Sequence, residues 1–227
     1  MKHNITRRNI QMPQVPFYGI VEDGVGYVQL TGFTDGASAE LRRAIAELKK
    51  QGMQRLVFDL RSNPGGSLDE AVSIVSMFVP HGSLVVSTKG KIPATCREMR
   101  TQAEPLLPDM PVCVLVDGNT ASSAEIVSGT LQDMDRAVII GQRTYGKGLV
   151  QAVRDAPYGG SLKLTTSRYH IPSGRCIQAY DYRHLNPDGS VGVVPDSVTH
   201  LFHTYSARAA RDGGRTKLYV ALWHVIF

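Results

Sequence analysis

Short apolar runs alternate with amphipathic helical segments along most of the chain. Residues 26–30 alternate as a half-buried strand does, and residues 56–58 form a short buried run. Between them, Leu41, Ile45 and Leu48 fall on one face of a helix. A strand, a helix and a second strand predict a right-handed crossover between parallel strands. Because the pattern repeats, we expect an α/β fold.

The pattern continues with a turn, a helix and a strand. Residues 63–66 (NPGG) are typical of a turn, and apolar residues then recur at helical spacing from Val72 to Val79. Residues 84–87 predict a strand. Residues 89–110 contain three prolines, and we expect an irregular excursion there that lines or covers a cleft.

A serine lies where the next strand gives way to a helix. Residues 112–116 form an apolar run closed by Asp-Gly-Asn, and helical spacing follows as far as Met134. Ser122 therefore lies at a helix N-terminus, where free amides and the helix dipole stabilise an anion such as a tetrahedral intermediate. The alternative is purely structural, because Ser122 and Glu125 also have the spacing of a capping box.

A lysine follows another buried strand, predicted at residues 137–140. Lys147 is flanked by Gly146 and Gly148, so we expect close packing to desolvate its ammonium partly and lower its pKa from about 10.4. A neutral lysine can act as a general base for a hydroxyl, and Gln151 is placed to orient it. The alternative is a solvated loop lysine.

The same loop is close to a phosphate-binding pattern. Glycines at 141 and 146 precede Lys147, but Gly148 replaces the Ser or Thr that would hold magnesium. Residues 149–153 resemble a strand rather than the helix that such a loop requires. Nucleotide binding, with the magnesium dependence it would bring, is therefore disfavoured.

A β-hairpin is expected beside the serine and the lysine. Residues 161–169 alternate, and residues 172–174 turn the chain into residues 175–179. An exposed strand edge there would let an extended peptide pair its backbone with the sheet.

Four segments occur in an order that resembles a known family, the C-terminal processing peptidases or tail-specific proteases. They are residues 59–66 (DLRSNPGG), 120–126 (TASSAEI), 131–133 (LQD) with Arg136, and 144–148 (TYGKG) with Gln151. The family consists of serine proteases that use a Ser/Lys pair. The resemblance implies a serine endopeptidase that cleaves polypeptides near their C-termini without a cofactor or a metal.

The resemblance also implies a role for each matching residue. Ser122 matches the nucleophile, Lys147 the base, and Gln151 the residue that completes the site. Two further residues, Asp133 and Arg136, match family positions, and we assign them to holding the site together.

The oxyanion hole is predicted from two amides. Adjacent glycines let backbone amides approach a ligand, so Gly66, or its neighbour Gly65, supplies one donor and Ser123 the other. The family places its donors at these matching segments. The alternative is a simple turn chosen for its positive φ angles.

In fold, the resemblance implies a crotonase-like core of repeated β-β-α and βαβ units with a β-hairpin-rich C-terminal part. We expect an extended lead-in at residues 1–20, the peptidase core at 21–200 and a C-terminal extension at 201–227. Residues 215–227 depart from the family pattern and are expected to be a truncated or non-native end. A segment of PDZ size, which the family uses to capture substrate C-termini, is not expected in this chain.

Composition narrows the function further. Hydrophobic residues make up 42% of the 227 residues and charged residues 20%, as in ordinary globular proteins. The net charge of +5 comes from scattered residues without interleaved aromatics, which disfavours nucleic-acid binding. The three cysteines lack metal-ligand spacing.

No stretch approaches the roughly 18 apolar residues of a membrane span, and the N-terminus lacks the apolar core of a signal peptide. The resemblance favours a cell-envelope or exported protein of which this chain is a part. Its expected partners are polypeptides with accessible C-termini, and no oligomeric state is predicted. The competing class is a non-enzymatic peptide- or ligand-binding module on the same fold.

Overall fold

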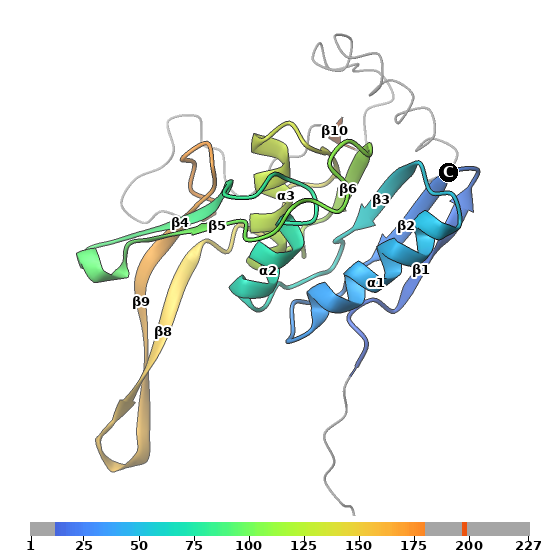
Figure 1. Ribbon diagram of the computed structural model, residues 1–227. Helices are drawn as coiled ribbons and strands as arrows, with labels where there is room; N and C mark the ends of the chain where they lie inside the picture. The colour runs from blue at the N-terminus through green and yellow to red at the C-terminus, as the bar shows by residue number, and fades with distance from the viewer. Residues whose placement is uncertain (1–11, 180–196, 199–227) are drawn as a thin grey trace, which may run out of the picture.

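The computed structural model describes residues 12–179 and 197–198, which form two sheets and three α-helices (Figure 1). The α/β prediction is confirmed. The larger sheet has the strand order β1-β2-β3-β6-β7-β10. Its strands are β1 (Phe17–Glu22), β2 (Val25–Gln29), β3 (Arg55–Asp59), β6 (Val112–Val116), β7 (Val138–Gly141) and β10 (Ser197–Val198).

The larger sheet is parallel except at one edge. Strand β1 pairs antiparallel with β2, whereas β2, β3, β6, β7 and β10 pair parallel in that order. Helix α1 (Ala37–Lys50) connects β2 to β3, and helix α3 (Ser123–Asp133) connects β6 to β7. The predicted strand-helix-strand units are therefore present.

The main core lies between one face of this sheet and the helices. Helix α1 buries the predicted stripe of Leu41, Ile45 and Leu48. Alternation along the strands sends one set of side chains to this core and the opposite set to a second apolar cluster on the other face. The first set includes Val28, Phe58, Val114 and Ile139, and the second includes Val57, Cys113, Leu115 and Ile140.

Helix α2 (Leu68–Val75) is shorter than its apolar spacing predicted, because it does not continue to Val79. Beyond Val75 the amides of Met77 and Phe78 bond three residues back, which tightens the chain into turns. Pro80 disfavours the α-helical region for Val79, the residue before it, and so opposes the predicted continuation to Val79.

The smaller sheet has the strand order β5-β4-β9-β8. Its strands are β4 (Leu84–Gly90), β5 (Arg97–Arg100), β8 (Leu149–Ala156) and β9 (Gly160–His170). Strand β5 lies inside residues 89–110, so the expectation of a wholly irregular excursion was wrong. Its sequence, Arg-Glu-Met-Arg, is mostly exposed and lacks the apolar alternation by which strands are recognised.

Strands β8 and β9 form a long hairpin that projects from the body of the fold (Figure 1). Both were predicted as strands. The predicted turn at residues 172–174 is also present, with the Gly174 amide donating to the Ile171 carbonyl. The predicted hairpin across this turn was wrong, because residues 175–179 form only an isolated bridge from Cys176 to His170 and β9 pairs with β8 and β4 instead.

The predicted C-terminal extension at 201–227 lies outside the described residues, and β1 begins within the segment expected to be a lead-in. Among the described residues, no helix is both long enough and apolar enough to cross a membrane.

Helix α1 begins without a capping side chain of its own, and a residue of α2 supplies one. Its N-cap residue is Gly36, and the Glu70 carboxylate accepts hydrogen bonds from the amides of Gly36 (2.9 Å) and Ser38 (2.7 Å). Burial raises the pKa of Glu70, but the Ser38 and Gly36 hydrogen bonds outweigh it and bring the pKa below its ordinary value.

We expect Glu70→Gln to lower the free energy of unfolding by about 1 kcal/mol at pH 7. Because the folded-state pKa is depressed, the carboxylate contributes stability above the unfolded-state pKa and loses it as pH falls through the folded-state pKa. Urea unfolding at pH 7 and pH 3 should therefore show the two chains converging at the lower pH. An unchanged difference at pH 3 would contradict this role for the charge.

Candidate active site

Ser122 lies at the N-cap of α3, at the end of the connection from β6. Its φ of 57° and ψ of −118° lie in a region that is strained for a residue with a Cβ atom. Such strain persists only where the surroundings hold the backbone in place, and it is concentrated at functional sites. The side chain is half-buried.

A buried asparagine fixes the glycine turn beside Ser122. The Asn63 side-chain amide donates to the Leu30 carbonyl (2.7 Å), and its Oδ1 accepts from the Gly65 amide (2.9 Å). The Asn63 carbonyl accepts from the Ala121 amide (2.9 Å). The turn after β3 is thereby fastened to the segment that carries Ser122.

The predicted oxyanion donors, Gly66 and Ser123, lie side by side. The Ser123 hydroxyl donates to the Gly66 carbonyl (2.8 Å). Gly65 approaches so closely that a Cβ added to it would lie 2.8 Å from both the Ser122 Cβ and the Ser123 nitrogen. Within the described ranges, neither the Gly66 nor the Ser123 amide donates a hydrogen bond to the protein.

A buried carboxylate joins the serine segment to the lysine loop. Glu125 is 0% exposed, and its Oε2 accepts from the amides of Ser122 (2.8 Å) and Lys147 (2.8 Å). Its Oε1 accepts from the Thr144 hydroxyl (2.6 Å) and the Gly146 amide (2.6 Å). One side chain thus holds both candidate catalytic segments, a role beyond the capping that its spacing predicted.

Opposing effects act on the Glu125 carboxyl. Burial raises its pKa, while the hydrogen bonds from Thr144 and from the backbone amides of Lys147, Ser122 and Gly146 lower it. Burial dominates, and the pKa lies above its ordinary value.

Lys147 is not desolvated as predicted, because its side chain is exposed. The close packing involves the neighbouring glycine backbones instead. The Ala179 amide donates to the Gly146 carbonyl (2.9 Å), and a Cβ on Gly148 would lie 2.6 Å from the Gln178 nitrogen. In the part of the chain that the structure describes, no hydrogen bond joins the Lys147 ammonium to the Ser122 hydroxyl.

Gln151 lies in β8, just beyond the lysine loop and opposite Thr165 of β9, and its side chain is exposed. A strand, not a helix, follows the loop, as expected. The phosphate-binding reading therefore lacks the helix N-terminus on which it depends.

Asp133 and Arg136 lie at the opposite end of α3 from Ser122. The Asp133 carboxylate forms an ion pair with Arg175 (2.9 Å) and accepts from the Ser173 amide (2.9 Å). The Arg136 guanidinium donates to the carbonyls of Phe78 (2.8 Å) and Leu107. Both side chains fasten surrounding segments at that end of the helix.

Three site residues carried no role in the sequence-based prediction, namely Asn63, Thr144 and Asp117. Asp117 accepts from the amides of Ser62 (2.9 Å) and Thr120 (2.9 Å) and so joins the connections after β3 and β6. Burial raises the pKa of Asp117, but hydrogen bonds from Ser62, from the Asn119 amide and from the Thr120 hydroxyl bring it below its ordinary value. Asn63 and Thr144 lie inside the matching segments 59–66 and 144–148, and all three are small polar residues that follow buried strands, which are the signals that could have identified them.

Comparison with known proteins identifies the family. The model of peptidase family S41 matches residues 24–198. The chain therefore belongs to peptidase family S41, and the resemblance inferred from the motifs is confirmed.

Two named relatives come from bacteria. The chain is 37% identical over 182 residues to the carboxy-terminal-processing protease of Bartonella bacilliformis, covering 78% of this chain and 39% of the relative. It is 33% identical over 174 residues to the carboxyl-terminal-processing protease of Picosynechococcus sp., covering 77% and 39%. The chain thus spans about two fifths of the length of these relatives.

Among solved structures, the photosystem II D1 C-terminal processing protease superposes with a TM-score of 0.67 at 34% identity. The match covers 77% of this chain and 42% of that one. Mature CPAF complexed with lactacystin has a TM-score of 0.62 at 16% identity and shows likeness of fold alone.

We expect Glu125→Gln to lower the free energy of unfolding by about 2 to 4 kcal/mol, because the amide nitrogen would face buried donors that lose their acceptor. Urea unfolding at neutral pH measures this. Glu98→Gln is the matched control, since Glu98 forms an exposed ion pair with Arg100 and should contribute less than about 1 kcal/mol. Equal effects of the two substitutions would contradict the anchoring role of Glu125.

Proposed function

We propose that this chain is the catalytic part of a serine endopeptidase in which Ser122 is the nucleophile and Lys147 the general base. The observation that carries the proposal is that a single oxygen of Glu125 accepts the amides of both residues, each at 2.8 Å. The contact brings two residues 25 positions apart in the sequence into one site. Membership of peptidase family S41 supports the same assignment.

An oxyanion hole formed by the Gly66 and Ser123 amides completes the proposal. Both amides belong to segments that are bonded to each other beside Ser122, and Ser123 opens α3. The dipole of that helix favours negative charge at its N-terminus. An oxyanion formed on attack by Ser122 would therefore meet two donors and a favourable field.

In the proposed reaction, neutral Lys147 takes the hydroxyl proton of Ser122 as its oxygen attacks the scissile carbonyl carbon. The oxyanion collapses, the peptide C–N bond breaks, and Lys147 returns the proton to the leaving amine. Water, deprotonated by Lys147, then attacks the acyl carbonyl carbon, the ester C–O bond breaks, and Lys147 returns the proton to the Ser122 oxygen. Gln151 orients the amine, and Asp133 and Arg136 hold the surrounding segments.

Because the Lys147 side chain is exposed, the proposed mechanism requires the bound substrate to shield its amine from water. The side chain has a flexible four-carbon stem, so its amine can swing toward Ser122. A polypeptide lying over the site would exclude water from the ammonium, and desolvation favours the neutral form.

The proposed substrates are polypeptides with accessible C-termini, cut near those ends. The relatives' printed names support this, as does β8, which is an edge strand among the described residues and offers backbone groups for pairing. We further propose that residues 21–200 form a crotonase-like peptidase core and that the whole protein is exported to the cell envelope.

One observation favours a second candidate, a non-enzymatic peptide-binding module. The Lys147 side chain is exposed and is not bonded to Ser122. A binding module would use the edge strand to pair with a peptide and would need no base aligned with Ser122. Chemical reactivity of Ser122 separates the two candidates.

We expect the native chain to cleave an unfolded model protein, and Ser122→Ala and Lys147→Ala each to reduce kcat/KM by at least about 10³-fold. Lys163→Ala, an exposed lysine farther along the hairpin, is the control and should retain activity. A fluorophosphonate probe, which forms a P–O bond with an activated serine and releases fluoride, gives a second readout by mass spectrometry. Cleavage that survives in both variants, or labelling that persists in Ser122→Ala, would contradict the proposal.

The pH profile tests the base. The neutral amine accepts the proton, so kcat/KM should rise from neutral toward alkaline pH. Circular dichroism across the same range controls for unfolding. A flat profile in a chain that stays folded would contradict lysine as the base.

A further inference from the structure

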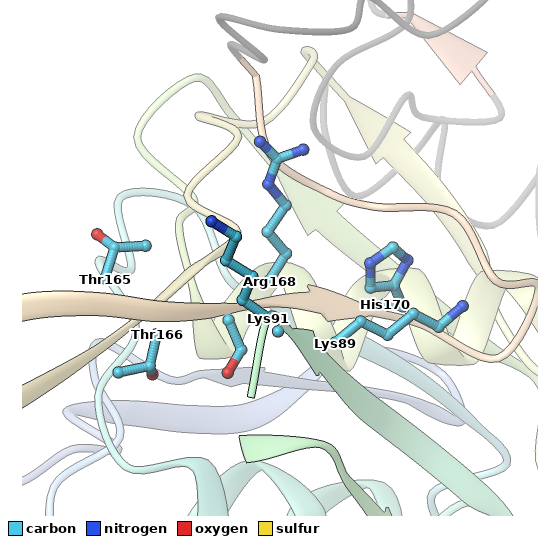
Figure 2. A pocket seen from close by; sticks show the side chains of 8 residues that line it. Lys89, Lys91, Thr165, Thr166, Arg168 and His170 are labelled. Atoms are coloured by element: carbon cyan, nitrogen blue, oxygen red, sulfur yellow. The ribbon is translucent and has the colours of Figure 1, made fainter. Parts of the chain in front are cut away.

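A cationic pocket of about 580 Å³ lies on the smaller sheet, outside the site described above (Figure 2). It is formed where β4 and the residue after it meet β9. Its lining residues are Lys89, Gly90, Lys91, Thr165, Thr166, Ser167, Arg168 and His170.

The antiparallel register of β4 and β9 brings the basic residues together. Lys89 is directly opposite Arg168, and Gly90 is opposite Ser167. Directly paired residues point to the same face of a sheet, so Lys89 and Arg168 share one face. Figure 2 shows their side chains and that of Lys91 at the same stretch of β9.

The turn that carries Lys91 is tied down. The Thr88 hydroxyl donates to the Thr95 carbonyl (2.7 Å), and the Ser167 hydroxyl donates to the same carbonyl (3.3 Å). Gly90 permits this close approach, because a Cβ there would lie 3.0 Å from the Ser167 hydroxyl. Lys91 is therefore presented from an anchored turn.

The lining is rich in positive charge and contains no carboxylate. Within residues 12–179 and 197–198, the ammonium groups of Lys89 and Lys91 make no hydrogen bond or ion pair. Glu98, the acidic residue of adjacent β5, is engaged by Arg100 (2.7 Å). The Thr166 hydroxyl donates to the Val150 carbonyl (3.5 Å), and the Thr165 hydroxyl adds a neutral donor to the lining. The pocket is therefore suited to carboxylates.

The pocket adjoins the proposed catalytic lysine loop. The Tyr169 amide donates to the Gly148 carbonyl (2.8 Å). Tyr169 directly follows Arg168 in the sequence, and Gly148 directly follows Lys147. Leu149 is opposite Arg168, and Gln151 is opposite Thr165. A peptide lying along this sheet would therefore reach both places within a few residues.

We propose that this pocket binds acidic side chains of a polypeptide substrate, a few residues from the scissile bond. The role of this polypeptide as a substrate rests on the proposed function, whereas its binding to the pocket does not. A peptide is favoured over a nucleic acid because the other basic residues are scattered and form no continuous track for a phosphate backbone.

The test uses the Ser122→Ala chain, which separates binding from cleavage. Fluorescence anisotropy at low salt compares a fluorescein-labelled peptide carrying four glutamates with the same peptide carrying glutamines. The glutamate peptide should bind about 2- to 10-fold more tightly, since each exposed pair contributes modestly. Adding Lys89→Gln and Lys91→Gln together should remove that preference.

Lys163→Gln is the matched control, because it removes an exposed charge from the same strand at a position outside the pocket lining. It should keep the preference. The proposal is overturned if the double variant retains the preference, if Lys163→Gln abolishes it equally, or if a single-stranded oligonucleotide of equal charge displaces the peptide and binds more tightly.

Kinetics on the native chain keep the two proposals distinguishable. A loss of cleavage in Ser122→Ala with intact acidic preference supports both. Acidic preference without any cleavage by the native chain leaves the pocket supported and the peptidase proposal contradicted. Cleavage by the native chain with no acidic preference in binding or in kcat/KM supports the peptidase proposal and contradicts the pocket proposal.

Discussion

A carboxylate shut away from water must be satisfied by donors, and in this protein that requirement organises the candidate active site. Glu125 is fully buried and accepts from four donors in two segments. Leaving such a group unpaired would cost several kcal/mol. The start of α3 and the lysine loop are therefore coupled, and the strained backbone of Ser122 is one end of that coupling.

The larger sheet provides the frame on which this coupling is built. Strands β3 and β6 are parallel neighbours, so the turns after them leave the sheet at the same end, next to the carboxyl ends of the strands. Two bonds then join those turns: the Asn63 backbone carbonyl accepts from the Ala121 amide, and the Asp117 carboxylate accepts from the Ser62 amide. Amides with no partner in the described protein collect there, which is the arrangement that an anionic intermediate requires.

The smaller sheet carries a different kind of chemistry. Its strand β8 follows the lysine loop, and its strand β9 lines the cationic pocket. The proposed catalysis and the proposed recognition of charge thus lie in adjacent parts of one backbone network, joined by the bond from the Tyr169 amide to the Gly148 carbonyl. The pocket could change through its lysines while the buried anchor stays the same.

By itself, the sequence determined most of the elements and the identity of the candidate residues, because periodic apolar spacing and local motifs are short-range signals. The helix carrying Leu41 and the strand before Ser122 are both present as predicted. Strand β5 escaped prediction because its polar edge has no apolar period. Only the tertiary structure decided that Lys147 is exposed and that Glu125 reaches it across 22 residues of sequence, since both depend on how segments distant in the chain pack together.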